Sequence, residues 1–227
     1  MLSGQGADEY LCGYRRYHAE QIIQRMSPVS KKLLSLSANM LPSSMPGRLN
    51  AFIRRFKRLA LASRQGKSER LPGYFMWNDP THIHNLFLNG SLILNDSAIS
   101  RFFEEHKNEN TLNAMLKADQ KYDLLSLNLA YSDKMSMMVG VEARVPFLDF
   151  DMIRLMNSIP LDMKLRGNKK KYILKKAMEP YLPKEIINRK KTGFALPIRS
   201  WFKEKNNIID KYFDYGRIKK QDIFDPN

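Results

Sequence analysis

The chain has 227 residues, enough to bury one sizeable core, and its 43% hydrophobic and 27% charged residues exclude a disordered chain. Its 38 Lys and Arg outnumber its 23 Asp and Glu, and the net charge of +15 fits a solvated basic surface, an anionic partner, or an acidic remainder of a larger protein. The single cysteine, Cys12, excludes an internal disulfide, and the lack of a signal-peptide pattern or of an apolar run of roughly 18 residues predicts a cytoplasmic protein with no membrane partner.

The first predicted elements are a turn and a helix. Residues 3–9 form a glycine-bearing turn, and Ala7–Met26 is predicted to be one helix because it holds good helix formers and apolar residues at helical spacing. A turn of this kind normally joins a buried strand to a helix. A strand is therefore expected before Met1, together with most of a parallel sheet that this chain lacks.

The rest of the chain is predicted to be a series of separate helices joined by loops, with a packed aromatic elbow over residues 70–80. Almost no segment alternates with period two, so the fold class is predicted to be mainly α. The further helices are predicted over Lys31–Leu41, Leu49–Ala62, Thr81–Leu88, Ala98–His106, Leu112–Met137 with an interruption near Tyr131 and Ser132, Phe150–Ser158, Lys171–Tyr181 and Pro197–Lys205.

The helix predicted over Leu49–Ala62 is strongly amphipathic and basic. Its apolar residues recur at helical spacing, and the cluster Arg54–Arg58 occupies the other positions. The apolar stripe fits the protein core better than an interface, and the basic face fits solvent better than nucleic acid. Nucleic acid is therefore not expected as a partner.

The first segment that could bind a ligand or a metal is residues 3–9, Ser-Gly-Gln-Gly-Ala-Asp-Glu. Glycines at 4 and 6 let backbone N–H groups approach an anion, and the helix that follows directs its positive end to the same place. Asp8 and Glu9 can either cap this helix or hold Mg²⁺. Taken alone, the pattern fits a glycine-containing helix start with acidic caps better than a binding site.

Two further segments concentrate charged and small residues. Residues 133–149 contain Asp-Lys-Met-Ser-Met and then Gly-Val-Glu-Ala-Arg-Val-Pro-Phe-Leu-Asp. Residues 171–194 contain Lys-Tyr-Ile-Leu, Leu-Pro and Arg-Lys-Lys-Thr-Gly-Phe. Lysines beside a glycine suit phosphate binding, because an ammonium group is a compact charge with several donors.

These three segments, in this order, resemble the synthetase domain of glutamine-dependent asparagine synthetases. That family typically shows Ser-Gly-Glu-Gly-Ala-Asp-Glu-Leu with Gly-Gly-Tyr, Asp-Arg-Met-Ser-Met with Glu-Ala-Arg-Val-Pro-Phe-Leu-Asp, and Lys-Tyr-Ile-Leu-Arg, Leu-Pro and a Lys-Gly-Phe segment. The match covers most of residues 1–18 and 112–202, whereas residues 19–111 match only in helical character and in the basic cluster. The resemblance implies that residues 1–227 are part of this domain, namely the C-terminal helical portion of an α/β nucleotide-binding domain of the ATP-pyrophosphatase (adenine nucleotide alpha hydrolase-like) type.

The resemblance also implies a reaction, its cofactors and its partners. ATP activates the side-chain carboxylate of aspartate as a β-aspartyl-adenylate, pyrophosphate leaves, and ammonia released from glutamine by a separate N-terminal domain displaces AMP. Two anions must meet in this reaction, so Mg²⁺ and fixed cations are expected to neutralise the phosphates. A homodimer is one expected state of the full-length protein.

The family's functional residues are carried over one position at a time. Arg144 has an alternative role as a buried partner of Glu142 or Asp149, and Lys171 has an alternative role as a solvated helix lysine. Cys12 is interpreted as a buried packing thiol. The positions carried over are Ser3, Gly4 and Gly6 for ATP contact, Asp8 for Mg²⁺, Asp133 and Glu142 for the aspartate and adenylate site, and Gln5, Lys171 and Arg144 for catalysis.

Gln5 departs from the family pattern, which commonly has Glu at this position close to the reacting carboxyl. An amide cannot act as a general base, although it can form hydrogen bonds. Gln5 therefore favours a rival function, the amidation of another carboxylate such as one in cell-surface polysaccharide synthesis. A second rival is an inactive remnant that acts as a basic binding module.

Two parts of the family's machinery are missing from this sequence. It holds neither the glutaminase domain with its N-terminal cysteine nor the Ser-Gly-Gly-x-Asp-Ser loop that binds pyrophosphate. By itself the chain is expected neither to hydrolyse glutamine nor to bind ATP tightly. The edge left by the absent sheet predicts poor solubility or self-association.

Overall fold

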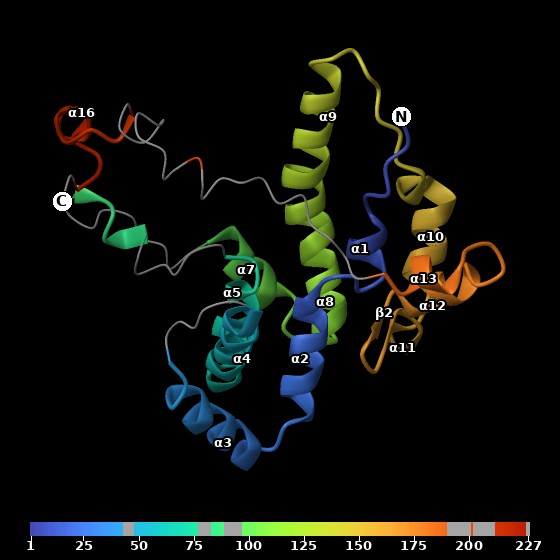
Figure 1. Ribbon diagram of the computed structural model, residues 1–227, viewed down its shortest axis with the longest axis horizontal. Coiled ribbons are helices and arrows are strands. Elements are labelled where there is room, and N and C mark those ends of the chain that lie inside the picture. Colours follow the sequence, from blue (N-terminus) through green and yellow to red (C-terminus); the bar gives the residue numbers. More distant parts are fainter. Residues whose placement is uncertain (43–47, 77–82, 89–96, 190–200, 202–211, 226–227) are drawn as a thin grey trace. The chain divides into compact units, whose positions relative to one another are not determined.

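The structure is a computed structural model that describes residues 1–42, 48–76, 83–88, 97–189, 201 and 212–225 (Figure 1). The chain divides into two compact units. The first unit contains Met1–Tyr74 and Ile99–Ile187, and the second contains Phe75–Ala98 and Asn188–Asn227. Most of the described residues are helical, which confirms the prediction of a mainly α chain.

Short helices make up most of the first unit. A two-stranded antiparallel hairpin, β1 (Leu165–Arg166) and β2 (Lys169–Lys170), is the sheet seen in the described residues. The helices of this unit are α1 (Ala7–Tyr10), α2 (Arg15–Arg25), α3 (Pro28–Asn39), α4 (Arg48–Arg64), α5 (Lys67–Gly73), α7 (Ala98–Glu105, apart from its first residue), α8 (Thr111–Ala118), the π-helix η3 (Asp119–Leu129), α9 (Ala130–Met137), the 3₁₀-helix η4 (Pro146–Leu148), α10 (Phe150–Ser158), α11 (Leu161–Lys164), α12 (Tyr172–Ala177) and α13 (Lys184–Ile187).

The described residues of the second unit include α16 (Tyr215–Gln221) and an antiparallel bridge between Phe87 and Phe224. The rings of these two phenylalanines lie 5.0 Å apart between centroids. Because Phe87 pairs in this way, the helix predicted over residues 81–88 does not reach Leu88. The helix predicted over Pro197–Lys205 lies outside the described residues, apart from Trp201.

Four predicted helices are confirmed closely, because α3, α4, α7 and α10 follow the predicted ranges within a few residues. Side-chain caps explain two of the starts. The Ser27 hydroxyl accepts a hydrogen bond from the Ser30 N–H at the start of α3, and the Asp149 carboxylate accepts one from the Asp151 N–H at the start of α10. In the basic helix α4, Ile53 is buried and Arg54 is exposed. Leu49, Phe52 and Leu61 of its apolar stripe are also exposed, so the prediction that this stripe belongs to the core is confirmed only in part.

The single helix predicted over Ala7–Met26 is wrong. The chain leaves helix after Tyr10, and Cys12 adopts a left-handed conformation with φ +55° before α2 begins at Arg15. The Leu11 carbonyl accepts a hydrogen bond of 3.1 Å from the Lys171 N–H instead of a bond within a continuing helix. A contact with a residue far along the chain therefore overrides local helix propensity.

The long helix predicted over Leu112–Met137 is present without the expected interruption near Tyr131. Helices α8, η3 and α9 follow one another directly, and the irregularity is instead an 11-residue π-helical stretch over Asp119–Leu129. Asp119, at the start of that stretch, is fully buried and accepts hydrogen bonds from Arg16 and Tyr17 of α2. The π-helix therefore begins where the long helix is anchored to α2.

One apolar cluster joins the three segments singled out in the sequence. Tyr10 and Leu11, directly after the first segment, are buried together with Leu124 of η3 and Met156 of α10. This core therefore brings the chemical segments of the sequence into one unit. The partly buried residues packed against it are Leu129, Phe147, Leu148, Met152, Ile153, Ile159, Ile173 and Leu174.

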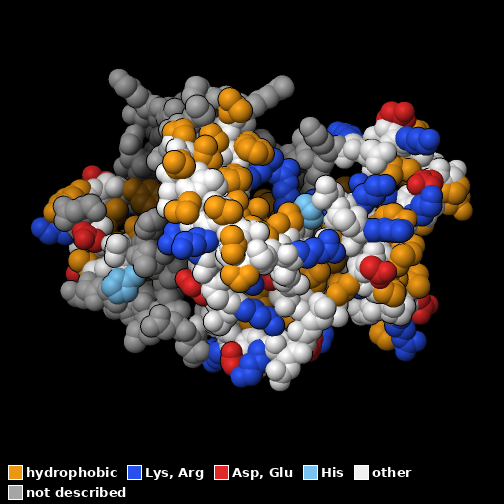
Figure 2. Space-filling model, turned by 90° about the horizontal axis from the view of Figure 1, so that it is seen from below, with side chains coloured by type: hydrophobic (Ala, Val, Ile, Leu, Met, Phe, Trp, Pro, Cys, Tyr) orange, Lys and Arg blue, Asp and Glu red, His pale blue; other side chains and the backbone are white. Residues whose placement is uncertain are grey.

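Large hydrophobic side chains also remain exposed in the first unit. Helix α3 carries an apolar stripe at spacings of three and four residues, opposite its buried Ala38. Figure 2 views the molecule from the side on which α3 lies in Figure 1, and hydrophobic side chains gather there beside Lys and Arg. The stripe consists of Val29, Leu33, Leu36 and Met40. Among the described residues, no helix combines the length and the apolar character that crossing a bilayer requires.

Candidate functional site

The first two chemical segments run side by side at the start of the chain. Leu2 and Arg144 form a parallel β-bridge, in which the Ser3 N–H donates to the Arg144 carbonyl at 2.8 Å. The Arg144 N–H donates in turn to the Met1 carbonyl, also at 2.8 Å. The backbones of two predicted site residues, Ser3 and Arg144, are thus held directly together.

The two glycines of the first segment have different surroundings. Gly6 has φ +93°, and a Cβ atom there would lie 2.5 Å from Cδ2 of Leu148, so glycine is required both by its backbone and by close packing. A Cβ on Gly4 would meet nothing within 4 Å, and Gly4 is exposed. Gly6 therefore joins the first segment to the second by packing, whereas the backbone of Gly4 is open to an incoming group.

Gln5 lies between these glycines and contacts the long helix. Its side-chain amide donates to the Asn128 carbonyl at 3.1 Å and to the Ser132 hydroxyl. Gln5 is therefore tied to η3 and α9 in the described structure. Its amide acts there as a hydrogen-bond donor.

The first and third segments meet in an ion pair between Asp8 and Lys171. The Lys171 ammonium Nζ lies 2.9 Å from Oδ1 of Asp8, and the two side chains are 24% and 18% exposed. The pair is thus partly shielded from water yet remains accessible from one side. A lysine ammonium and a carboxylate in such a place can exchange partners with a phosphate group and a metal ion.

The backbone around the pair is unusual on both sides. Cys12 and Lys171 both have positive φ angles, +55° and +51°, and Lys171 is the N-cap of α12. The Gly13 N–H donates to the backbone carbonyl of Asp8 at 2.8 Å, which closes the turn after α1. These conformations place Asp8 and Lys171 opposite each other even though they are far apart in the sequence.

Glu9 points into the protein rather than toward the Asp8–Lys171 pair. It is buried and accepts hydrogen bonds from the Tyr14 hydroxyl and, at 3.2 Å, from Nδ2 of Asn128. Burial and the bond to Glu9 both raise the pKa of Tyr14, so Tyr14 remains a neutral donor. Of the two carboxylates suggested for capping or Mg²⁺, Glu9 is thus committed to internal hydrogen bonds. Sequence inspection missed this role, because Tyr14 and Asn128 carry no local signal of it.

The other site residues of the second segment lie on the surface. Arg144 forms an ion pair of 2.9 Å with Glu142, and these side chains are 72% and 66% exposed. The alternative role of Arg144 was a buried pair with Glu142 or Asp149. The pair with Glu142 is present, but it lies at the surface. Asp133 is exposed on α9. A shallow hollow of about 520 Å³ follows this segment and is lined by Glu142, Ala143, Arg144, Val145, Pro146, Leu148 and Asp149.

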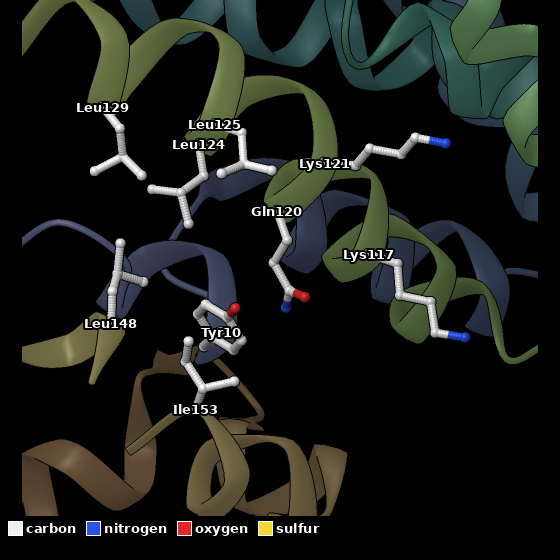
Figure 3. Close-up of a pocket in the computed structure, with 9 residues that line it drawn as sticks. All are labelled: Tyr10, Lys117, Gln120, Lys121, Leu124, Leu125, Leu129, Leu148 and Ile153. Carbon is white, nitrogen blue, oxygen red and sulfur yellow. The ribbon is translucent and has the colours of Figure 1, made fainter. Parts of the chain in front are cut away.

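A second hollow of about 420 Å³ lies between α1, η3 and α10 (Figure 3). Leucines and Ile153 gather around it with the ring of Tyr10, whereas the ammonium groups of Lys117 and Lys121 point away from this apolar part. Lys117 is engaged with the carboxylate of Glu109 at 2.8 Å. The predicted site residues do not line this hollow, which is an apolar gap in the core cluster. Its lining residues are Tyr10, Lys117, Gln120, Lys121, Leu124, Leu125, Leu129, Leu148 and Ile153.

The donor set at Asp8 suits one kind of metal site only. Within the described ranges, no group of three or more His, Cys, Asp and Glu side chains is placed to hold an ion. A single carboxylate still fits Mg²⁺ when phosphate oxygens and water supply its other ligands, which is how this ion is commonly bound. Asp8 is therefore suited to a metal that arrives with a phosphate.

Comparisons with known proteins show the family of this chain. The profile of the asparagine synthase family matches residues 1–227. The asparagine synthetase [glutamine-hydrolyzing] 1 of Bacillus subtilis is 30% identical over 210 residues, which are 91% of this chain and 32% of that protein. A putative asparagine synthetase [glutamine-hydrolyzing] of Mycobacterium bovis is 27% identical over 235 residues, 99% of this chain and 34% of that protein.

A more distant relative is the amidase chyE of Penicillium rubens, 24% identical over 227 residues that cover 88% of this chain and 32% of that protein. No solved structure gives a significant match. The chain spans about a third of the length of the curated relatives it matches. Because the family profile covers the whole sequence and the three segments meet in one unit, the chain belongs to the asparagine synthase family.

Proposed function

We propose that the full-length protein containing this chain converts aspartate to asparagine with ATP, through a β-aspartyl-adenylate, and that a separate glutaminase domain supplies the ammonia. The observation that carries this proposal is the Asp8–Lys171 pair, formed where the first and third family segments meet. The relatives named asparagine synthetase support the same reaction. The proposal includes a nucleotide-binding α/β domain, and ATP and Mg²⁺ as cofactors.

The proposed roles follow from the charge that the reaction must handle. The Lys171 ammonium binds a phosphate oxygen and stabilises the negative charge that develops as pyrophosphate leaves. The Asp8 carboxylate, once Lys171 has turned to the phosphate, holds the metal that accompanies it. Bound Mg²⁺ supplies charge neutralisation to the phosphates. The exposed backbone of Gly4 and the N–H of Ser3 belong to the nucleotide-binding side of this site.

The residues proposed for aspartate belong to the second segment and not to the Asp8–Lys171 pair. Arg144 and Glu142 line the shallow hollow of the second segment, and we propose that this hollow is the place of the aspartate and adenylate together with Asp133. Arg144 is paired with Glu142 in the absence of substrate. An incoming carboxylate exchanges with Glu142 for the guanidinium group of Arg144.

A second candidate function is the amidation of a different carboxylate, and Gln5 is the observation that favours it. The amide of Gln5 donates hydrogen bonds to Asn128 and Ser132, and an amide cannot accept a proton as a general base. Gln5 therefore shapes the site by hydrogen bonding. A site shaped in this way can serve a carboxylate larger than that of aspartate.

ATP–pyrophosphate exchange on the full-length protein tests the proposal. Exchange that depends on aspartate is the expected result, and exchange with another carboxylate alone would favour the second candidate. Asp8→Asn should abolish exchange while thermal unfolding stays unchanged. The matched control Asp162→Asn changes an exposed carboxylate and should leave exchange intact. Full exchange by Asp8→Asn would remove Asp8 from the proposed site.

A further inference from the structure

Gly13 lies beside the Asp8–Lys171 pair, and a side chain at this position would overlap the ends of both charged side chains. A Cβ atom on Gly13 would lie 1.8 Å from Oδ1 of Asp8 and 2.6 Å from both Cγ of Asp8 and Cε of Lys171. Distances under 3.0 Å do not occur at real Cβ atoms, so something must shift. The volume that glycine leaves open is thus occupied by the two charged side chains themselves.

The other glycines in the described part of the chain do not share this environment. A Cβ on Gly6 would clash with the apolar side chain of Leu148, which indicates packing. A Cβ on Gly4, Gly73, Gly140 or Gly167 would meet nothing within 4 Å. Among the glycines with described surroundings, Gly13 is the one whose close neighbours belong to an ion pair.

The backbone next to Gly13 is strained on both sides of the same contact. Cys12 precedes it at φ +55°, and Lys171 lies opposite at φ +51°. Left-handed conformations cost energy for residues with a side chain, and they persist where the surrounding structure enforces them. Here the enforcing contact is the hydrogen bond of 3.1 Å from the Lys171 N–H to the Leu11 carbonyl. Gly13 therefore lies against Lys171 in a turn whose backbone conformation is energetically unfavourable.

We propose that Gly13 is a positioning residue for the Asp8–Lys171 pair. It leaves open the space in which the carboxylate and the ammonium-bearing end of the lysine meet, and any side chain at this position separates them or displaces both. The effect on catalysis rests on the proposed function. The steric coupling between residues 13 and 8 holds whether or not that function is correct.

A double-mutant cycle on thermal unfolding tests the coupling without using activity. Gly13→Ala is expected to lower the unfolding midpoint by roughly 2–4 °C, a small shift because the atoms that must move are the ends of side chains. In an Asp8→Ala background the same substitution should cost much less, because the nearest clashing atoms are gone. Equal shifts in both backgrounds would overturn the proposal. Gly73→Ala is the matched control, since its Cβ enters open space, and it should leave the midpoint unchanged.

Gly13→Ala can also fail to fold alone. In that case recovery of a folded double variant with Asp8→Ala supports the coupling, and a double variant that remains unfolded overturns it. The double-mutant cycle therefore tests the coupling whether or not the Gly13→Ala variant folds alone.

Steady-state exchange of pyrophosphate into ATP tests the catalytic consequence. Gly13→Ala should lower kcat by roughly 100-fold, as the loss of a positioned charge does, while the KM for ATP changes by less than about threefold. If Gly13 only stabilised the fold, Gly13→Ala would lower the amount of folded protein, and the folded fraction would keep the kcat of the unchanged protein. The control Gly73→Ala should leave both kcat and KM unchanged. A Gly13→Ala variant with wild-type kcat would overturn the positioning role. If the unchanged protein shows no exchange with any carboxylate, the proposed function fails, and the unfolding cycle still decides on Gly13.

Discussion

Two ion pairs in the same unit are built in opposite ways. Arg70 and Glu20 are 9% and 1% exposed, and they lie on the regular helices α5 and α2. Glu20 accepts bonds of 2.8 and 3.0 Å from the guanidinium group of Arg70 and a third from the Tyr74 hydroxyl. Asp8 and Lys171 are more exposed and lie beside left-handed backbone.

This difference indicates that the Arg70–Glu20 pair stabilises the fold and that the Asp8–Lys171 pair is suited to binding a ligand. A buried, bidentate pair with further donors cannot exchange partners without exposing an unpaired charge to a low-dielectric interior. A partly exposed lysine–carboxylate pair has weaker mutual attraction and can exchange its partners at lower cost. We therefore expect substitutions at Arg70 to change stability and substitutions at Lys171 to change activity.

The largest expected effect on stability comes from Arg70→Ala, which leaves the buried Glu20 carboxylate without its main partner. The free energy of unfolding should fall by about 3–5 kcal/mol, as it does when one member of a buried pair is removed. Urea denaturation followed by circular dichroism measures this change. Arg54→Ala, at an exposed position of α4, is the control and should change the free energy of unfolding by less than about 0.5 kcal/mol. A loss as small as that of the control would contradict the structural role of the pair.

The largest expected effect on activity comes from Lys171→Ala. Turnover in pyrophosphate exchange should fall by about 100- to 1,000-fold, because an interaction with developing phosphate charge is lost. Lys176→Ala removes an exposed lysine of the same helix that pairs with Glu179, and turnover should remain unchanged. A rise in KM alone after Lys171→Ala would show that Lys171 only binds the nucleotide.

A smaller loss of stability is expected from Gly6→Ala. The new methyl group would strain a backbone at φ +93° and meet Leu148, which together should lower the free energy of unfolding by about 1–3 kcal/mol. The companion variant Gly4→Ala adds a methyl group to open space and should have no measurable effect on unfolding. Equal stability of the two variants, measured by thermal denaturation, would mean that the packing of Gly6 against the second segment does not matter.

The last prediction concerns Cys12, and its effect is absent at neutral pH and appears only at high pH. Burial raises the pKa of the Cys12 thiol from 9.0 to about 12. The folded protein therefore keeps the proton in a range where the unfolded chain loses it, and this contribution to stability should disappear as the pH rises between about 9 and 12. Cys12→Ala should show a shallower loss of stability over that interval than the unchanged protein. Identical slopes for both proteins in alkaline urea titrations would contradict the prediction.

The sequence predicted well wherever structure depends on neighbours in the chain. The ranges of α3, α4, α7 and α10 followed from hydrophobic spacing, proline positions and polar caps. The burial of Cys12 was also predicted correctly. The hairpin of β1 and β2 and helices α5 and α16 were missed, because segments of two to seven residues hold too little periodicity to detect.

Prediction from sequence was weakest at the candidate site itself. The three segments contained Asp8, Lys171 and Arg144, and Glu142 was one of two partners suggested for Arg144. Nothing in the sequence indicated that Asp8 pairs with Lys171 or that the Arg144–Glu142 pair lies at the surface. Gly6 was expected to contact a nucleotide, and its close packing against Leu148, which the sequence did not indicate, leaves that expectation untested. The assignments of all these residues to substrate, metal and catalysis stay predictions.

By itself, the sequence determined the mainly α character of the chain and its family, because helical periodicity and the order of the three segments are properties of the chain read in one dimension. Only the tertiary structure decided that the first helix ends at Tyr10, that Cys12 turns left-handed and that Gly13 faces an ion pair. The physical reason is that these features depend on Lys171, whose backbone N–H and ammonium group reach the first segment only after the chain has folded.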